Sequence, residues 1–254
     1  MDNQSCIFWF SGTGNSLYAA KKLSCDLDNM PLVRITSDPP SGAVGGTGAK
    51  VGFVFPSYYG NLPRAVRILV EKLDILPETY IFSVVTKGGV GQGSIGSLDN
   101  VLKKKGLRLN YGKCVHMPAN YVITYNPANP DNSRNALDKA DGLFKTIAAD
   151  ISLKKQSLWK LPVTANNLYY NIDKLDEAFN ANGECTGCGL CEKVCPVSNI
   201  KLFNGKPNWL HHCEHCVACI SWCPAKAINY GEKTQERRRY RNPRINVDEL
   251  KRII

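Results

Sequence analysis

The chain has no long apolar run: none of its hydrophobic stretches approaches the ~18 residues that a membrane-spanning helix requires. Its start also lacks the charged, apolar and cleavage-site regions of a secretory signal peptide. Disulfide frameworks belong to small secreted domains, so the eleven cysteines are expected to be thiols or metal ligands. We therefore expect a cytoplasmic protein with no membrane span.

Eight of the eleven cysteines lie in a pattern that the chain repeats. Each copy reads C-x2-C-x2-C-x3-C-P, and the second copy begins 28 positions after the first (213 − 185 = 28). The segment resembles the bacterial two-cluster ferredoxins, in which three close cysteines bind one [4Fe–4S] cluster and the cysteine before proline binds the other. The implied ligand sets are Cys185, Cys188, Cys191 and Cys223 for one cluster, and Cys213, Cys216, Cys219 and Cys195 for the second.

Structural zinc does not fit this pattern, because a tetrahedral site usually takes two paired-cysteine arms and would leave the third cysteine of each copy unused. The cysteines outside the repeat, Cys6, Cys25 and Cys114, are given no role. His211, His212 and His215 lie beside the second copy. With two full cysteine sets available, these histidines are interpreted as supporting or surface residues rather than ligands.

Residues 1–155 alternate short apolar runs with amphipathic ones. This alternation predicts a doubly wound, five-stranded parallel sheet, in which ligands bind beyond the carboxyl ends of the strands. The expected strands are 6–10, 32–36, 51–55, 80–85 and a segment within 107–117. The expected helices follow the turn 11–16 and span about 62–73, 94–105 and 133–154.

The loop after the first expected strand is rich in hydroxyl groups and glycine and opens directly onto a helix. Free backbone N–H groups and the helix dipole at such a position suit a phosphate. The loop contains no lysine or arginine, so binding would depend on neutral donors; the alternative is an ordinary capped turn. Its candidate binding residues are Ser11, Gly12, Thr13, Gly14, Asn15 and Ser16.

This loop resembles the phosphate-binding loop of flavodoxins, S/T-x-T-G-N-T/S. The resemblance extends to residues 56–63, where flavodoxins place an aromatic ring against the isoalloxazine; Tyr59 matches that position best, and Tyr58 is the alternative. It implies an FMN cofactor, a flavodoxin-like strand order of 2-1-3-4-5, and a third flavin loop at residues 86–89. The further candidate residues are Pro56, Ser57, Tyr58, Tyr59, Gly60, Asn61, Thr86, Lys87, Gly88 and Gly89.

A flavodoxin-like domain followed by a small α+β two-[4Fe–4S] ferredoxin domain resembles the flavodoxin–ferredoxin fusion proteins of anaerobic bacteria and archaea. The segments 117–121 and 239–243 also look like that family. The expected division is 1–156 for the FMN domain, 157–182 for a linker and docking helix (helix at 167–180), 183–230 for the ferredoxin domain, and 231–254 for a basic tail.

The basic tail is interpreted as solvated or packed on the chain; docking of an acidic redox partner is the alternative. Two oxidised clusters and an FMN phosphate, each about −2, would lower the formal net charge from +10 to about +4. No nucleic-acid reader motif accompanies the arginines, so no nucleic-acid partner is expected.

Flavin and clusters together predict an electron-transfer protein that relays electrons between FMN, two [4Fe–4S] clusters and external redox proteins. Acidic ferredoxins, flavodoxins or oxidoreductases are the partners considered, and no catalytic residue is assigned. One alternative is an FMN-dependent reductase of a small substrate, fed by the clusters, with Tyr58, Tyr59, Lys87 or Tyr121 as proton donor. Another is a redox sensor or scaffold in which the clusters serve as structural staples.

Overall fold

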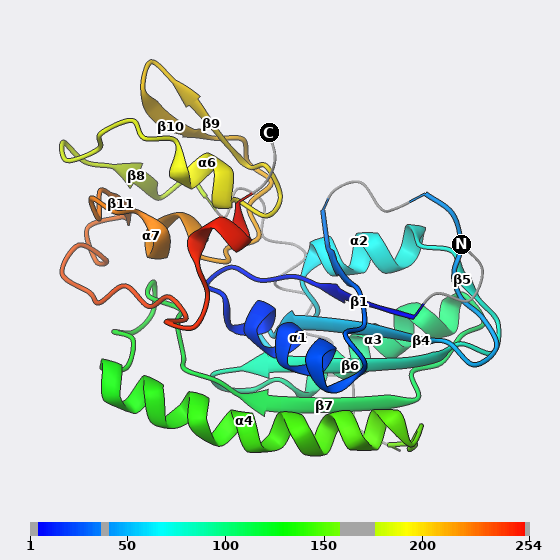
Figure 1. Cartoon of the computed structure of the whole chain (residues 1–254). Helices are drawn as coiled ribbons and strands as arrows, with labels where there is room; N and C mark the ends of the chain where they lie inside the picture. The colour runs from blue at the N-terminus through cyan, green and yellow to red at the C-terminus, as the bar shows by residue number, and fades with distance from the viewer. Residues whose placement is uncertain (1–4, 37–40, 158–175, 252–254) are drawn as a thin grey trace.

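The structure is a computed structural model that describes residues 5–36, 41–157 and 176–251. A layered α/β part forms the first portion of the chain, and a small cysteine-rich part lies beyond one end of its sheet (Figure 1). None of the helices in these described ranges combines the length and the hydrophobicity that a membrane span requires.

The five predicted strands form one parallel sheet in the order β2-β1-β4-β6-β7. In terms of these five strands the order is 2-1-3-4-5, so the predicted flavodoxin-like topology is confirmed. Their carboxyl ends point toward the cysteine-rich part (Figure 1). The bounds are β1 (Cys6–Trp9), β2 (Leu32–Arg34), β4 (Lys50–Pro56), β6 (Tyr80–Lys87) and β7 (Tyr111–His116).

Helices cover both faces of the sheet, because successive side chains of its strands point to opposite faces. Ile7 and Trp9 pack under α1 (Asn15–Asp26) and α4 (Pro130–Ser152). Phe8 belongs to the core under α2 (Arg64–Lys72) and α3 (Gln92–Lys104), where its ring stacks on Phe53 at 5.6 Å. The central strands are buried on both faces, which explains their continuous apolar runs.

A second, two-stranded parallel pair was not predicted: β3 (Val44–Gly45) with β5 (Ile75–Leu76). Two-residue strands are too short to show any periodic pattern in the sequence.

Within residues 176–230, the cysteine-rich part contains two antiparallel strand pairs and two short helices. Their bounds are β8 (Phe179–Ala181) with β11 (Ile228–Tyr230), β9 (Ile200–Phe203) with β10 (Lys206–Trp209), α6 (Leu190–Val194) and α7 (Ala218–Trp222). Of the predicted helix 167–180, residues 167–175 lie outside the described residues. For the remainder the prediction was wrong: 176–178 form a turn and Phe179 begins β8, where it pairs with Tyr230 and stacks on Trp209.

The tail returns to the first part of the chain and ends in a 3-10 turn, η1 (Val247–Leu250), near the top of α1 (Figure 1). We call residues 231–251 the C-terminal segment. Tyr240, Asn242, Ile245 and Leu250 within it are buried. Of the two forms in which the tail was predicted, solvated or packed on the chain, the structure shows the packed one.

Candidate functional site

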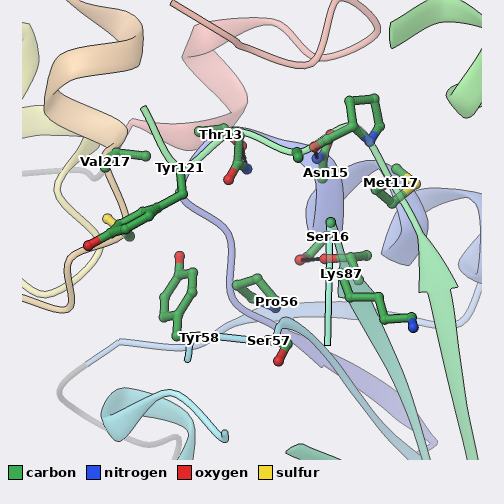
Figure 2. Close-up of a pocket in the computed structure, with 18 of the residues that line it drawn as sticks. Thr13, Asn15, Ser16, Pro56, Ser57, Tyr58, Lys87, Met117, Tyr121 and Val217 are labelled. Atoms are coloured by element: carbon green, nitrogen blue, oxygen red, sulfur yellow. Dashed lines mark hydrogen bonds between the residues drawn. The ribbon is translucent and has the colours of Figure 1, made fainter. Parts of the chain in front are cut away.

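A cavity of about 570 Å³ opens at the carboxyl edge of the sheet (Figure 2). We call it the large cavity. Its volume lies in the range of small-molecule and cofactor pockets. The loops after β1, β4 and β6 line it, with every flavin-binding candidate from the sequence except Gly14 and Asn61.

The loop 11–16 turns sharply into α1 through Gly14, whose φ of 97° is strained for any residue with a side chain. No side chain caps the start of α1, and its first turn contains no acidic residue. The first N–H groups of a helix have no intrahelical acceptor, so they are available to an anion. Ser11 and Ser16 are held by internal bonds: Ser11 Oγ accepts from the Gly14 N–H (3.1 Å), and Ser16 Oγ lies 2.7 Å from Thr86 Oγ1.

The Asn15 side chain has hydrogen-bond partners within the protein. Its Nδ2 donates to the carbonyl of Pro118 (3.1 Å), while its Oδ1 accepts from Tyr240 Oη (2.7 Å) and Asn242 Nδ2 (3.1 Å). The side chain therefore joins the loop to two distant segments of the chain, although Asn15 still lines the large cavity.

Three polar rings meet on one wall of the large cavity. Tyr59 Oη lies 2.5 Å from Tyr121 Oη and 2.8 Å from His215 Nδ1, and Tyr121 Oη lies 2.6 Å from the same nitrogen. Burial raises the pKa of both tyrosines, so their phenols stay protonated at neutral pH. Tyr58 lies deeper, edge to face with Phe10 at 6.3 Å, and Figure 2 shows it rising from the loop after β4.

The eight repeat cysteines gather around two much smaller cavities. One is lined by the outer cysteine set: Cys185, Cys188, Cys191 and Cys223. The other is lined by the inner cysteine set: Cys195, Cys213, Cys216 and Cys219. Each cavity thus collects three cysteines of one sequence copy and the cysteine before proline of the other.

The thiols of these sets are costly to ionise without a positive charge among them. Burial, followed by the neighbouring thiols, raises the pKa of Cys191 and Cys213 to about 12. In the described part of the chain, no three His, Cys, Asp or Glu side chains form a group that could hold a metal ion. The four thiols of each set instead surround a gap, which fits a cluster in which each thiolate binds a different iron.

Comparison with known proteins addresses the cysteine-rich part directly. Residues 184–228 match the family described as 4Fe-4S dicluster domain. Comparison of the sequence with curated proteins gave no match. We therefore call this part of the chain the dicluster domain.

Two solved structures show a weak overall likeness to the chain. One is a predicted flavoprotein from Bacteroides uniformis ATCC 8492, with 17% identity, a TM-score of 0.34, and coverage of 46% of this chain and 92% of that chain. The other is a predicted flavoprotein from Bacteroides eggerthii DSM 20697, with 19% identity, a TM-score of 0.32, and coverage of 55% and 98%. The strand order confirms a flavodoxin-like fold for the first part of the chain, and the family match confirms a dicluster domain in the second.

The dicluster domain packs directly on the loop 11–16. A Cβ atom added at Gly12 would lie well inside contact distance of the Cys216 carbonyl oxygen and 3.0 Å from Cys216 Cβ. Trp222 Nε1 donates to the Gly12 carbonyl (3.1 Å). Cys216 and Val217 line both the large cavity and the inner cysteine cavity, so the two sites share a wall.

A buried carboxylate makes a second contact between the dicluster domain and the first part of the chain. Glu214, beside the inner cysteine set, accepts from the backbone N–H groups of Arg64 (3.1 Å) and Ala65 (2.9 Å). Pro63, the N-cap residue of α2, gives no side-chain cap, so a residue of the dicluster domain does it instead. An anion at a helix N-terminus is also favoured by the helix dipole.

Some residues around the large cavity were not among the flavin-binding candidates, although Tyr121 was considered as a proton donor. Segment 117–121 follows β7 at the same sheet edge as the chosen loops, so the rule that selected those loops could also have selected it. His215, Cys216 and Val217 lie about 130 residues further along the chain than the end of β6. No local pattern signals such a contact.

Asp176 is a buried carboxylate that supports the inner cysteine set. It accepts from Asn199 Nδ2 (2.6 Å) and from the backbone N–H of His211 (3.1 Å), while the Asn199 N–H donates to Cys195 Sγ (3.2 Å). Asp176→Ala should destabilise the cluster-loaded chain by about 2–3 kcal/mol, because bonds to a charged acceptor are lost. Anaerobic urea unfolding, followed by cluster absorbance, measures this.

The pH dependence of that loss has a definite sign. Burial raises the pKa of Asp176, but the hydrogen bonds from Asn199 and His211 outweigh it and lower the pKa overall. Its stabilisation is therefore complete above the usual aspartate pKa of about 3.9 and is lost as pH falls through the lower folded pKa. The difference from the native chain should therefore shrink as pH falls below about 4. Exposed Asp131→Ala is the control, and an equal loss in both variants would contradict the assignment.

Proposed function

We propose that the protein passes electrons between an FMN in the large cavity, two [4Fe–4S] clusters and external redox proteins in the cytoplasm. The observation that carries the proposal is the shared wall: Cys216 and Val217 line both the large cavity and the inner cysteine cavity. FMN exchanges one or two electrons and each cluster exchanges one, so the three together can divide electron pairs into single electrons.

The residues around each site support an order for the transfer. Three cysteines of the inner set, Cys195, Cys216 and Cys219, are buried, and Cys216 also lines the large cavity. In the outer set, Cys188 is exposed. An inner cluster would therefore exchange electrons with the flavin, and an outer cluster would exchange them with a partner protein.

The surface beside the outer set favours an acidic partner. Lys206 Nζ donates to the Cys185 carbonyl (3.3 Å), and Lys193 and Lys226 are exposed next to cysteines of the same set. Phe203, on the same hairpin as Lys206, is 71% exposed. Basic groups around an apolar contact increase the rate at which an acidic protein associates.

The second prediction tests that surface by charge reversal. Lys206→Glu should slow the reduction of an acidic bacterial ferredoxin by the reduced protein roughly fivefold at low salt, with the difference vanishing near 1 M salt. Stopped-flow absorbance measures the rate. Lys139→Glu makes the same charge change on the exposed face of α4 and should leave the rate unchanged. Equal slowing by both substitutions would contradict docking at the outer set.

The cofactor content tests the proposal as a whole. Anaerobically purified and reconstituted protein should contain one FMN and about eight irons per chain. Iron without FMN, even after incubation with excess FMN, would overturn the relay and leave a dicluster domain attached to a flavodoxin-like module of another function.

A second function is favoured by one observation, the hydrogen-bonded group of Tyr59, Tyr121 and His215 on the wall of the large cavity. A flavin-dependent reductase of a small substrate needs a proton donor beside its site, and a phenol held in this way can supply one. Turnover of a small electron acceptor that Tyr121→Phe abolishes would favour the reductase. Reoxidation by protein carriers alone favours the electron-transfer protein.

A further inference from the structure

The C-terminal segment makes direct polar contacts with the loop 11–16. Tyr240 Oη and Asn242 Nδ2 both donate to Asn15 Oδ1, at 2.7 and 3.1 Å. The backbone N–H of Asn242 donates to the carbonyl of Thr13 (2.8 Å). Asn242 is 0% exposed and Asn15 is 5% exposed, so these bonds are made away from solvent.

These contacts determine which way the loop's peptide groups point. In a trans peptide the carbonyl and the following N–H point in opposite directions. The bond from Asn242 holds the Thr13 carbonyl toward the C-terminal segment, and the Gly14 N–H consequently faces the other side, where it donates to Ser11 Oγ (3.1 Å). Thr13 Oγ1 is held separately by Asn120 Nδ2 (2.5 Å).

The contact is also sterically close. A Cβ atom added at Gly14 would lie 3.1 Å from Asn242 Cβ and 3.3 Å from Ile245 Cβ. The backbone of the segment thus lies against the turn at which α1 begins. That turn carries the N–H groups that an anion would use. The shape of the turn, and with it the position of these groups, depends on what packs behind it.

The segment is anchored firmly on both sides of this contact. Arg244 Nη1 donates to Tyr18 Oη (2.7 Å) and to Asp141 Oδ2 (2.8 Å), which ties the segment to α1 and α4. Further along, Arg34 Nη1 donates to the Leu250 carbonyl (2.8 Å), and Lys21 pairs with Glu249. On the other side, Arg237 Nη1 donates to the carbonyls of Val122 and Ile123, both at 2.7 Å.

We propose that Tyr240 and Asn242 are positioning residues of the FMN site, holding the loop 11–16 from behind in the conformation that binds the phosphate. The inference rests on the proposed function, since it assumes that the large cavity binds FMN. Neither residue lines that cavity, so neither is expected to touch the flavin ring. Their effect should therefore be confined to the phosphate.

Flavin affinity separates a positioning role from a general structural one. The test compares FMN with riboflavin, which has the same ring and no phosphate, by equilibrium dialysis against the full cluster-loaded chain. For Asn242→Ala and for Tyr240→Phe, the dissociation constant of FMN should rise about threefold to tenfold, as expected for the loss of single hydrogen bonds. The dissociation constant of riboflavin should change by less than about twofold.

A matched control lies in the same segment. Asn246→Ala makes the same chemical change, but the Asn246 side chain caps η1 by accepting from the Asp248 N–H (3.0 Å). It should leave both affinities unchanged. If Asn242→Ala does not fold, as judged by its iron content and circular dichroism, Tyr240→Phe gives the result, because it removes one hydroxyl and keeps the ring.

Each result is decisive. FMN affinity unchanged in the folded variants, or equal losses for FMN and riboflavin, would overturn the positioning role and leave the proposed function intact. A native chain that binds no FMN would overturn the proposed function itself. Weakened binding of FMN alone would make the C-terminal segment part of the flavin site.

Discussion

Replacing Cys216 with alanine should remove the inner cluster and stop electron transfer from the flavin to the outer cluster. Cys216 is a member of the inner cysteine set and also forms part of the wall of the large cavity. Iron content should fall from about eight to about four atoms per chain, since one cubane is lost. Iron analysis and anaerobic rapid mixing, followed by cluster absorbance, measure both effects.

Two matched substitutions make this result specific. Cys188→Ala should also halve the iron content, but by removing the outer cluster, so that electrons still pass from the flavin to the inner cluster and no longer reach a protein acceptor. Cys114→Ala changes a cysteine outside both sets and should keep about eight irons. A Cys216→Ala protein with full iron and the native transfer rate would show that the sets are wrongly assigned.

Substituting Gly12 with alanine should separate the loop 11–16 from the dicluster domain while leaving the clusters bound. The added methyl group would overlap the carbonyl oxygen of Cys216, which is backbone and cannot turn away as a flexible side chain would. Overpacking of this kind costs about 1–3 kcal/mol. The shift would also weaken the bond from Trp222 Nε1 to the Gly12 carbonyl. Slower transfer between flavin and clusters, measured at saturating FMN and with iron retained, is the expected result.

Gly142→Ala is the control for this change. Gly142 is exposed on α4, nothing lies within 4 Å of its added Cβ, and alanine in a helix interior is favoured by roughly 0.5–1 kcal/mol. Its transfer rate should equal that of the native chain. If Gly12→Ala keeps the native stability and rate, the close contact between Gly12 and Cys216 does not form in solution.

The sheet could be predicted because each strand carries its own signal. The segments that became β1, β4 and β6 are short apolar runs, each followed by a loop and a helix, and this alternation permits few topologies. The rule that ligands bind at the carboxyl edge then selected loops that do line one cavity. The spacing of the cysteines likewise matched the two groups that the structure brings together.

Contacts between distant segments could not be predicted in this way. Asn15 was predicted as a phosphate-binding residue, and nothing in the sequence indicated that its side chain bonds to Pro118, Tyr240 and Asn242, up to 227 positions away. Phe179 fitted a helical pattern of apolar residues, but pairing with Tyr230 places it in β8. In both cases the partner lies far along the chain, and local periodicity carries no information about it.

Electron transfer inside one molecule is the property that the proposed function requires. Protein loaded with FMN and both clusters is reduced at the flavin by a brief anaerobic pulse, and flavin and cluster absorbance are followed together over a tenfold range of protein concentration. The shared wall at Cys216 and Val217 predicts that flavin reoxidation and cluster reduction proceed with one rate constant that does not depend on concentration. A rate proportional to protein concentration would contradict this, because electrons would then pass only between molecules.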